Sequence, residues 1–74
     1  MTQYRCDFFA GDGIKAVESF EAIDDAGAIL EARELILRSS FVAVEIWREK
    51  DFIGRISVRP HLKVIVGGKD KAGP

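Results

Sequence analysis

The chain lacks most of the residues that reinforce very small proteins. Its 74 residues include one cysteine, Cys6, so no disulfide can form within the chain, and one histidine, His61. With so few soft ligands, a closed zinc site within one chain is not expected. A domain of this length buries only about 60% of the surface that its unfolded chain exposes, which leaves a monomer marginally stable. Because the usual staples are missing, we expect the chain to be reinforced by self-association.

The sequence is also short of net charge and of long apolar runs. Its formal net charge of −1 lacks the basic excess that neutralises phosphate groups, so general nucleic-acid affinity is not expected. No segment approaches the roughly 18 apolar residues of a membrane-spanning helix, and the N-terminus shows no basic leader followed by an apolar run. We therefore expect a soluble, cytoplasmic protein without membrane association, and a lone thiol fits that reducing compartment.

Alternating polarity predicts a first β-hairpin near the N-terminus. Residues 4–10 alternate as a half-buried strand does, the "GDG" that follows is typical of a turn, and "IKAVESFEA" resumes a strand. A three-residue loop sets Tyr4 opposite Phe20, whereas a two-residue turn at the end of "GDG" sets Asp7 opposite Glu18. Like charges that face each other are unfavourable, so the longer loop is preferred, but the pattern alone leaves the register open.

A second hairpin is predicted for "VAVEIWREKDFIGRISV", residues 42–58. A three-residue loop from Glu49 to Asp51 pairs apolar with apolar residues and Glu45 with Arg55. A loop one residue shorter or longer breaks both kinds of pairing. With the preferred loop, the expected pairs are Val42–Val58, Val44–Ile56, Glu45–Arg55, Ile46–Gly54 and Trp47–Ile53.

Between the two hairpins, "DDAGAILEARELILRSS" has the period of a helix. Asp24 is the predicted N-cap, because its carboxylate can accept from free amide groups of the first turn. The apolar stripe suited to covering a sheet comprises Ala28, Ile29, Ala32, Leu35 and Ile36. Leu30 and Leu37 fall about 100° round from Ile29, outside that stripe. Either the helix is deeply set, or its flank contacts another chain.

Together these elements predict an α+β fold in the order β-β-α-β-β. We expect an antiparallel four-stranded sheet with one helix packed on one face, in the order 2-1-3-4 if the third strand pairs with the first. Residues 61–66, "HLKVIV", follow a proline and form either a short fifth edge strand or a loosely attached arm. We assign residues 1–66 to a single domain and expect the glycine-rich residues 67–74 to form a disordered tail.

No set of residues in the sequence resembles a catalytic or metal centre. Cys6 shares a strand face with Tyr4 and Phe8, which is typical of a buried small hydrophobe. His61 has no partner placed by local spacing to form a catalytic pair. The "GDG" segment joins two strands and does not open a helix, so it does not resemble a phosphate-binding loop. We expect no enzymatic activity, no cofactor and no metal.

The sheet face away from the helix carries the most informative surface residues. Phe9, Trp47 and Ile53 are expected there, where they would form an apolar patch beside Arg55. On this face and the helix flank, the candidate interface residues are Phe9, Trp47, Ile53, Arg55, Leu30 and Leu37.

The segments "YRCDFF", "DDAGAILEARELI" and "AVEIWREKDFIGRI" together resemble a class of short bacterial proteins of unknown function, seen especially in alphaproteobacteria. The resemblance covers roughly residues 4–56 and implies a β-β-α-β-β fold. It implies no activity and no functional residues.

The sequence predicts a small interaction module that associates with itself, as a homodimer, or with another protein. The open sheet face and the helix flank are the surfaces expected to do this. The alternative is a single-stranded nucleic-acid binder, in which Phe9 and Trp47 stack on bases and neighbours such as Arg55 contact phosphates. Asp7 and Glu45 on the same face oppose that alternative.

Overall fold

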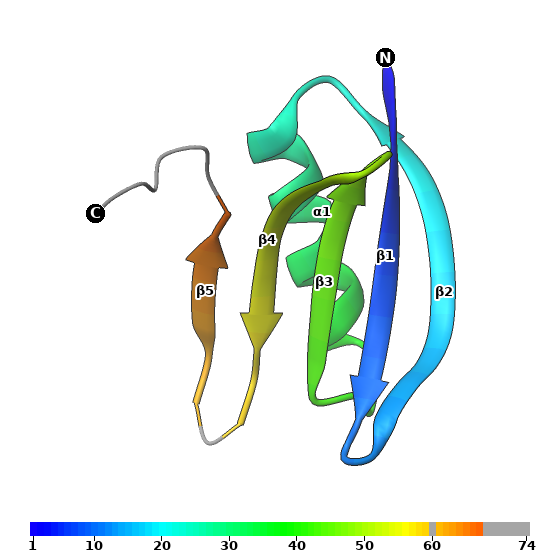
Figure 1. Cartoon of the computed structure of the whole chain (residues 1–74). Helices are drawn as coiled ribbons and strands as arrows, with labels where there is room; N and C mark the ends of the chain where they lie inside the picture. The colour runs from blue at the N-terminus through cyan, green and yellow to red at the C-terminus, as the bar shows by residue number, and fades with distance from the viewer. Residues whose placement is uncertain (60, 68–74) are drawn as a thin grey trace, which may run out of the picture.

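The computed structural model describes residues 1–59 and 61–67, which form one five-stranded sheet and one helix. All neighbouring strands are antiparallel in the order β2-β1-β3-β4-β5, and α1 lies across one face of the sheet (Figure 1). The elements are β1 (Thr2–Ala10), β2 (Gly13–Ala22), α1 (Asp25–Leu37), β3 (Ala43–Arg48), β4 (Asp51–Ser57) and β5 (Lys63–Val66). The predicted α+β fold is confirmed, and "HLKVIV" supplies the fifth edge strand.

The C-terminal end of the described chain is held against β4. Gly67 donates its backbone N–H to the carbonyl oxygen of Ile53 at 2.8 Å, so the ladder between β4 and β5 continues beyond Val66. Gly67, the first residue of the expected tail, is therefore hydrogen-bonded to the sheet. Residues 68–74 of the expected tail lie outside the described residues.

The helix begins where its sequence predicts. Asp24 has an extended backbone, and its Oδ1 accepts the backbone N–H of Gly27 at 2.8 Å, which confirms it as the N-cap. The side of α1 that faces the sheet buries Ala28, Ala32 and Ile36. Two of these three are alanines, so the helix backbone can approach the strands closely.

The flank of the helix lies at the surface. Leu30 and Leu37 are 63% and 52% exposed, so the alternative of a deeply set helix is wrong. Nothing among the described residues covers these two leucines, and they remain available to another chain.

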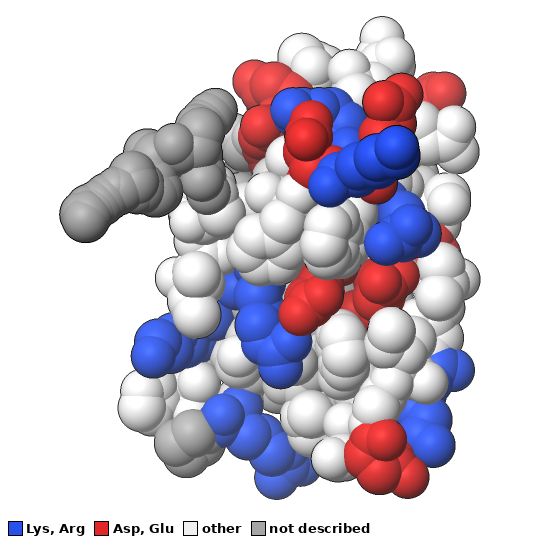
Figure 2. All heavy atoms as spheres, viewed as in Figure 1, with Lys and Arg blue, Asp and Glu red and all other residues white. Residues whose placement is uncertain are grey.

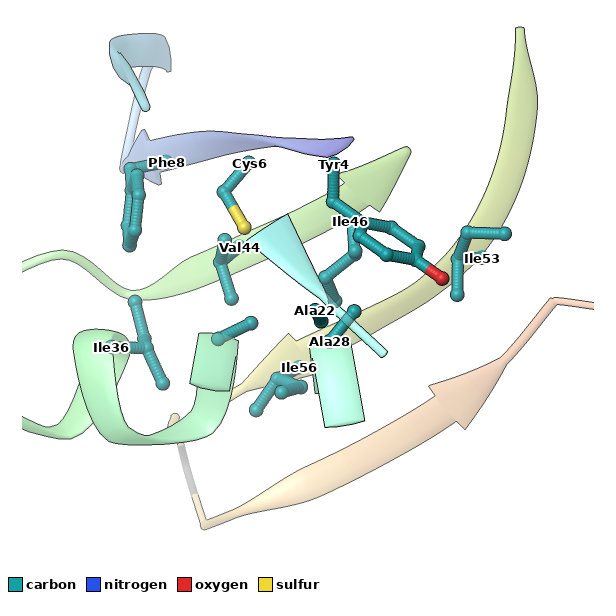
Figure 3. Close-up of a cluster of buried hydrophobic side chains, with 11 residues drawn as sticks. Tyr4, Cys6, Phe8, Ala22, Ala28, Ile36, Val44, Ile46, Ile53 and Ile56 are labelled. Carbon is teal, nitrogen blue, oxygen red and sulfur yellow. The ribbon is translucent and has the colours of Figure 1, made fainter. Parts of the chain in front are cut away.

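The core is a single apolar layer between α1 and the sheet (Figure 3). The inward face predicted for β1 is confirmed, whereas Ile53 of β4, which the pattern placed on the opposite face, also lies in the core. Each large aliphatic side chain buried there contributes about 1.5–3 kcal/mol. The layer is made by Tyr4, Cys6 and Phe8 of β1, Val44 and Ile46 of β3, Ile53 and Ile56 of β4, and Ala28, Ala32 and Ile36 of α1.

In the first hairpin, a two-residue turn and a β-bulge replace the predicted three-residue loop. The turn is formed by residues 11–12, and the register shifts between Phe8 and Phe9. Beyond this bulge Tyr4 lies opposite Phe20, so the preferred register is confirmed. The prediction of the loop itself is wrong, because the extra residue sits in the ladder and not in the turn.

The second hairpin has the same construction. Residues 49–50 form the turn, and the register shifts between Ile46 and Trp47. The predicted pairs Val44–Ile56, Glu45–Arg55 and Ile46–Gly54 are confirmed. On the turn side of the bulge, Trp47 lies opposite Phe52, so the predicted pairing of Trp47 with Ile53 is wrong.

Burial of one side chain accounts for this difference. The bulge turns Ile53 towards α1, where it is only 5% exposed and belongs to the core. Full burial of an isoleucine is worth about 1.5–3 kcal/mol, which outweighs one interrupted ladder pair worth about 0.5–1.5 kcal/mol. Phe52 is left to contact Trp47 on the other face.

We expect Gly54→Ala to push β5 away from β4. A Cβ at position 54 would lie 2.8 Å from the backbone oxygen of Ile65, and a strand backbone cannot yield as a flexible side chain does. The variant should lose about 1–3 kcal/mol in urea unfolding. It should also speed hydrogen exchange of the Gly67 amide, which bonds to β4.

The matched control for this prediction is Gly11→Ala in the first turn. Apart from its two neighbours in the chain, no described residue has an atom within 4 Å of a Cβ placed there, so the stability should be nearly unchanged. Equal stability of the two variants would contradict the close approach of β5 to Gly54.

Candidate functional site

Two ion pairs occupy the centre of the open sheet face, defined here as the face opposite α1 and seen in Figure 2. Asp7 of β1 lies directly opposite Glu45 of β3. Arg5 donates from Nε to Asp7 Oδ1 at 3.1 Å, and Arg55 donates from Nη1 to Glu45 Oε2 at 2.8 Å. Facing carboxylates repel each other, and each is offset here by its own guanidinium.

The same two arginines cover aromatic rings of the open sheet face. The guanidinium carbon of Arg5 lies 5.6 Å from the Trp47 ring centroid, and that of Arg55 lies 5.0 Å from the Phe9 ring centroid. Phe52 meets Trp47 edge to face, with ring centroids 5.3 Å apart. These rings are therefore engaged within the chain, and only part of each is left for a partner.

The continuous apolar patch expected on this face does not form. Along the pairing of β1 with β3, the charged pair Asp7–Glu45 lies between Trp47 and Phe9. Ile53, expected beside Trp47, lies in the core and offers no surface to a partner. The sequence pattern missed this because it could not locate the bulge that turns Ile53 inward.

Trp47 is a half-buried residue and not a free surface anchor. Arg5 and Phe52 contact its ring, as described above, and its Nε1 is buried without a hydrogen-bond acceptor among the described residues. A buried donor without a partner costs about 1–3 kcal/mol, so the packing of the ring compensates for a polar defect. The candidates Phe9, Trp47 and Arg55 share the open sheet face, but they are used mainly to hold it together.

A second group of exposed apolar side chains lies along one edge of the sheet. We call residues 62–66 the β5 edge, because they form or adjoin β5, the edge strand opposite β2 in the sheet (Figure 1). Their exposed apolar side chains are Leu62 at 40%, Val64 at 42%, Ile65 at 46% and Val66 at 67%. The sequence signal for this surface is the apolar run "LKVIV", which we could assign either to an edge strand or to an arm.

The first turn of α1 is fastened to the sheet by charged and polar groups. Tyr4 donates its hydroxyl to Asp25 Oδ1 at 2.7 Å, and Arg48 donates from Nη1 to the same oxygen at 2.5 Å. Arg48 also reaches Asp51 at 3.3 Å. Burial, together with the hydrogen bond to Asp25, raises the pKa of Tyr4, and the hydrogen bond to Asp25 raises the pKa of Arg48.

Shallow hollows adjoin Arg48 on the surface around this cluster. The guanidinium is already held by the carboxylates of Asp25 and Asp51, so the arrangement does not favour capture of an external anion. No local pattern in the sequence indicates this cluster, since its members come from β1, α1, β3 and β4.

Cys6 is fully buried, and the loss of hydration raises the pKa of its thiol to about 12. Reactive thiols need a thiolate at neutral pH, so this environment suits packing and not nucleophilic chemistry. His61 is exposed beside the β5 edge. Within residues 1–59 and 61–67, no group of three or more His, Cys, Asp or Glu residues is placed to hold a metal ion.

Among the described residues, no helix combines the length and the apolar character needed to cross a membrane. Comparison of the chain with family models, with curated proteins and with solved structures gives no match. The resemblance to short bacterial proteins therefore stays a prediction.

We expect the buried thiol of Cys6 to make the free energy of unfolding fall at alkaline pH. The folded chain keeps the thiol proton up to about pH 12, whereas the unfolded chain releases it near pH 9.0. Between these values the unfolded state binds fewer protons, so the free energy of unfolding falls as the pH rises. Urea unfolding across this window should show a shallower fall for Cys6→Ala. Identical slopes for the variant and the parent protein would contradict this assignment.

Asp25→Ala should destabilise the protein by about 1–3 kcal/mol, because it leaves the buried Tyr4 hydroxyl without its acceptor. Asp12→Ala is the control. Among the described residues Asp12 pairs only with Lys15, at an exposed site, so this substitution should change stability by about 0.5 kcal/mol or less. In a Tyr4→Phe background the effect of Asp25→Ala should shrink. Additive effects of the two substitutions in urea unfolding would rule out this coupling.

Proposed function

We propose that this protein is a small interaction module that works as a homodimer and has no enzymatic activity of its own. The observation that carries the proposal is the placement of exposed apolar side chains on a chain with a thin core. Leu30 and Leu37 of the helix flank and Val66 of the β5 edge are each more than half exposed. Covering such residues is favourable by about 25 cal/mol per Å² of apolar surface.

The open sheet face supports this proposal less than the sequence led us to expect. Its two central guanidiniums, Arg5 and Arg55, already pair with carboxylates, and they lie over the rings of Trp47 and Phe9. A partner binding there would have to compete with contacts within the chain. Among the described residues, Leu30, Leu37 and the exposed apolar side chains of the β5 edge are not held in this way, so the helix flank and the β5 edge are the better candidates for a protein interface.

The same arrangement disfavours the single-stranded nucleic-acid binder. Binding of that kind uses free cations beside aromatic rings whose faces can receive bases. Arg5 and Arg55 are paired with Asp7 and Glu45, so a phosphate would have to displace a carboxylate. The net charge of −1 adds no general attraction.

Sedimentation velocity and static light scattering over a micromolar to submillimolar range provide the test. We expect the mean mass to rise with concentration towards twice the 8.2 kDa of one chain. High salt should leave this association intact, because screening weakens charge-driven contacts and not apolar ones.

A protein that stays monomeric over the whole range would overturn the proposal. The same samples should be titrated with mixed single-stranded oligonucleotides as a second arm. Tight binding that weakens steeply with salt would instead support the nucleic-acid alternative.

A further inference from the structure

The two edges of the sheet differ in how they are protected against pairing with another strand. Exposed edge strands commonly carry charged residues, which discourage such pairing. The β2 edge follows this pattern with exposed Lys15, Glu18 and Glu21. In contrast, β5 carries a single charge, Lys63, followed by Val64, Ile65 and Val66, all exposed.

The backbone of β5 also has hydrogen-bonding groups directed away from the sheet. Gly67 donates its N–H to Ile53 of β4, and the N–H and C=O groups of alternate strand residues point to the same side. The backbone N–H and C=O groups of Lys63 and Ile65 therefore point towards β4, whereas those of Val64 and Val66 point away from it. No strand of residues 1–59 or 61–67 lies on that outer side.

We propose that a second copy of this chain pairs its β5 with this edge in antiparallel fashion, joining two five-stranded sheets into one. A two-fold axis that relates antiparallel neighbours must run perpendicular to the sheet, since an axis along the strands would make them parallel. Rotation about such an axis does not exchange the two faces of the sheet. Both copies of α1 then cover the same face of the joined sheet.

Symmetry makes the apolar side chains of β5 self-complementary. An axis through Ile65 pairs Ile65 with Ile65 and Val64 with Val66 of the other copy. An axis through Val64 pairs Val64 with Val64 and Leu62 with Val66. In both arrangements Lys63 faces Gly67 or Ile65, so it never meets a second Lys63 and no like charges oppose each other. Both arrangements also use the outward groups of Val64 and Val66 as ladder hydrogen bonds.

This inference rests on the proposed self-association and assigns it a surface. A standard interface buries about 800 Å² per partner, which is roughly a sixth of the 4788 Å² surface of the chain. A four-residue edge strand covers less than this. We therefore expect a dissociation constant in the micromolar range and not tighter.

The test compares four variants of the full chain by sedimentation velocity, one of which, Leu30→Lys, probes the helix flank. Val66→Lys places a charge on the proposed interface, and Val64→Pro removes an outward N–H that β4 does not use. Val17→Lys is the matched control, because Val17 is an exposed valine (56%) on the opposite edge strand. The first two variants should raise the dissociation constant about tenfold or more, while the control should leave it unchanged.

Hydrogen exchange provides a second readout of the same contact. The Val64 and Val66 amides should be protected in concentrated protein and lose protection on dilution. The Gly67 amide, which bonds to β4, should keep its protection in the dimer, in the monomer and in Val64→Pro. This last measurement also checks that β5 stays in place in the variant.

Three results would count against the inference, and they separate it from the proposed function. If dimers persist in Val66→Lys and Val64→Pro but are lost in Leu30→Lys, self-association stands and the helix flank replaces β5. If Val17→Lys weakens the dimer as much as Val66→Lys does, the assignment to one edge is wrong. If the parent protein is monomeric at every concentration, both proposals fail.

Discussion

The contact between α1 and the sheet is the interaction on which the rest of the structure depends. Ala28 and Ala32 are fully buried, and their small side chains allow the helix to lie close to the strands. At one end of the helix, Tyr4 and Arg48 both bind Asp25, which fixes how the helix is rotated on the sheet. One helix cannot cover five strands, so the core is confined to the strands beneath it, and every residue of β5 remains exposed.

The same contact explains the irregularity of the second hairpin. The helix offers an apolar surface to β4, and the bulge lets Ile53 reach that surface. Phe52 then lies on the opposite face, where it packs against the edge of Trp47. Trp47 is thereby half-buried by neighbours from its own chain. The bulge interrupts the ladder between β3 and β4 and adds the side chain of Ile53 to a small core.

The open sheet face and the sheet edges have different roles as a result. On the open face, each carboxylate of the Asp7–Glu45 pair has a guanidinium, and each guanidinium lies over a ring. The charged groups and rings at the centre of this face therefore have partners within one chain. Apolar surface and outward backbone groups are left together at the β5 edge, which is why the functional proposals centre on that strand and on the helix flank.

The sequence by itself determined the features that depend on near neighbours along the chain. These are the inward face of β1, the N-cap at Asp24 and the pairing of Glu45 with Arg55, because side-chain period, capping and charge pairing are local rules. Only the tertiary structure decided where Ile53 points, what Asp25 binds and which apolar residues stay uncovered. Those outcomes depend on contacts between elements far apart in the sequence, since the burial gained against α1 is larger than the cost of a bulge.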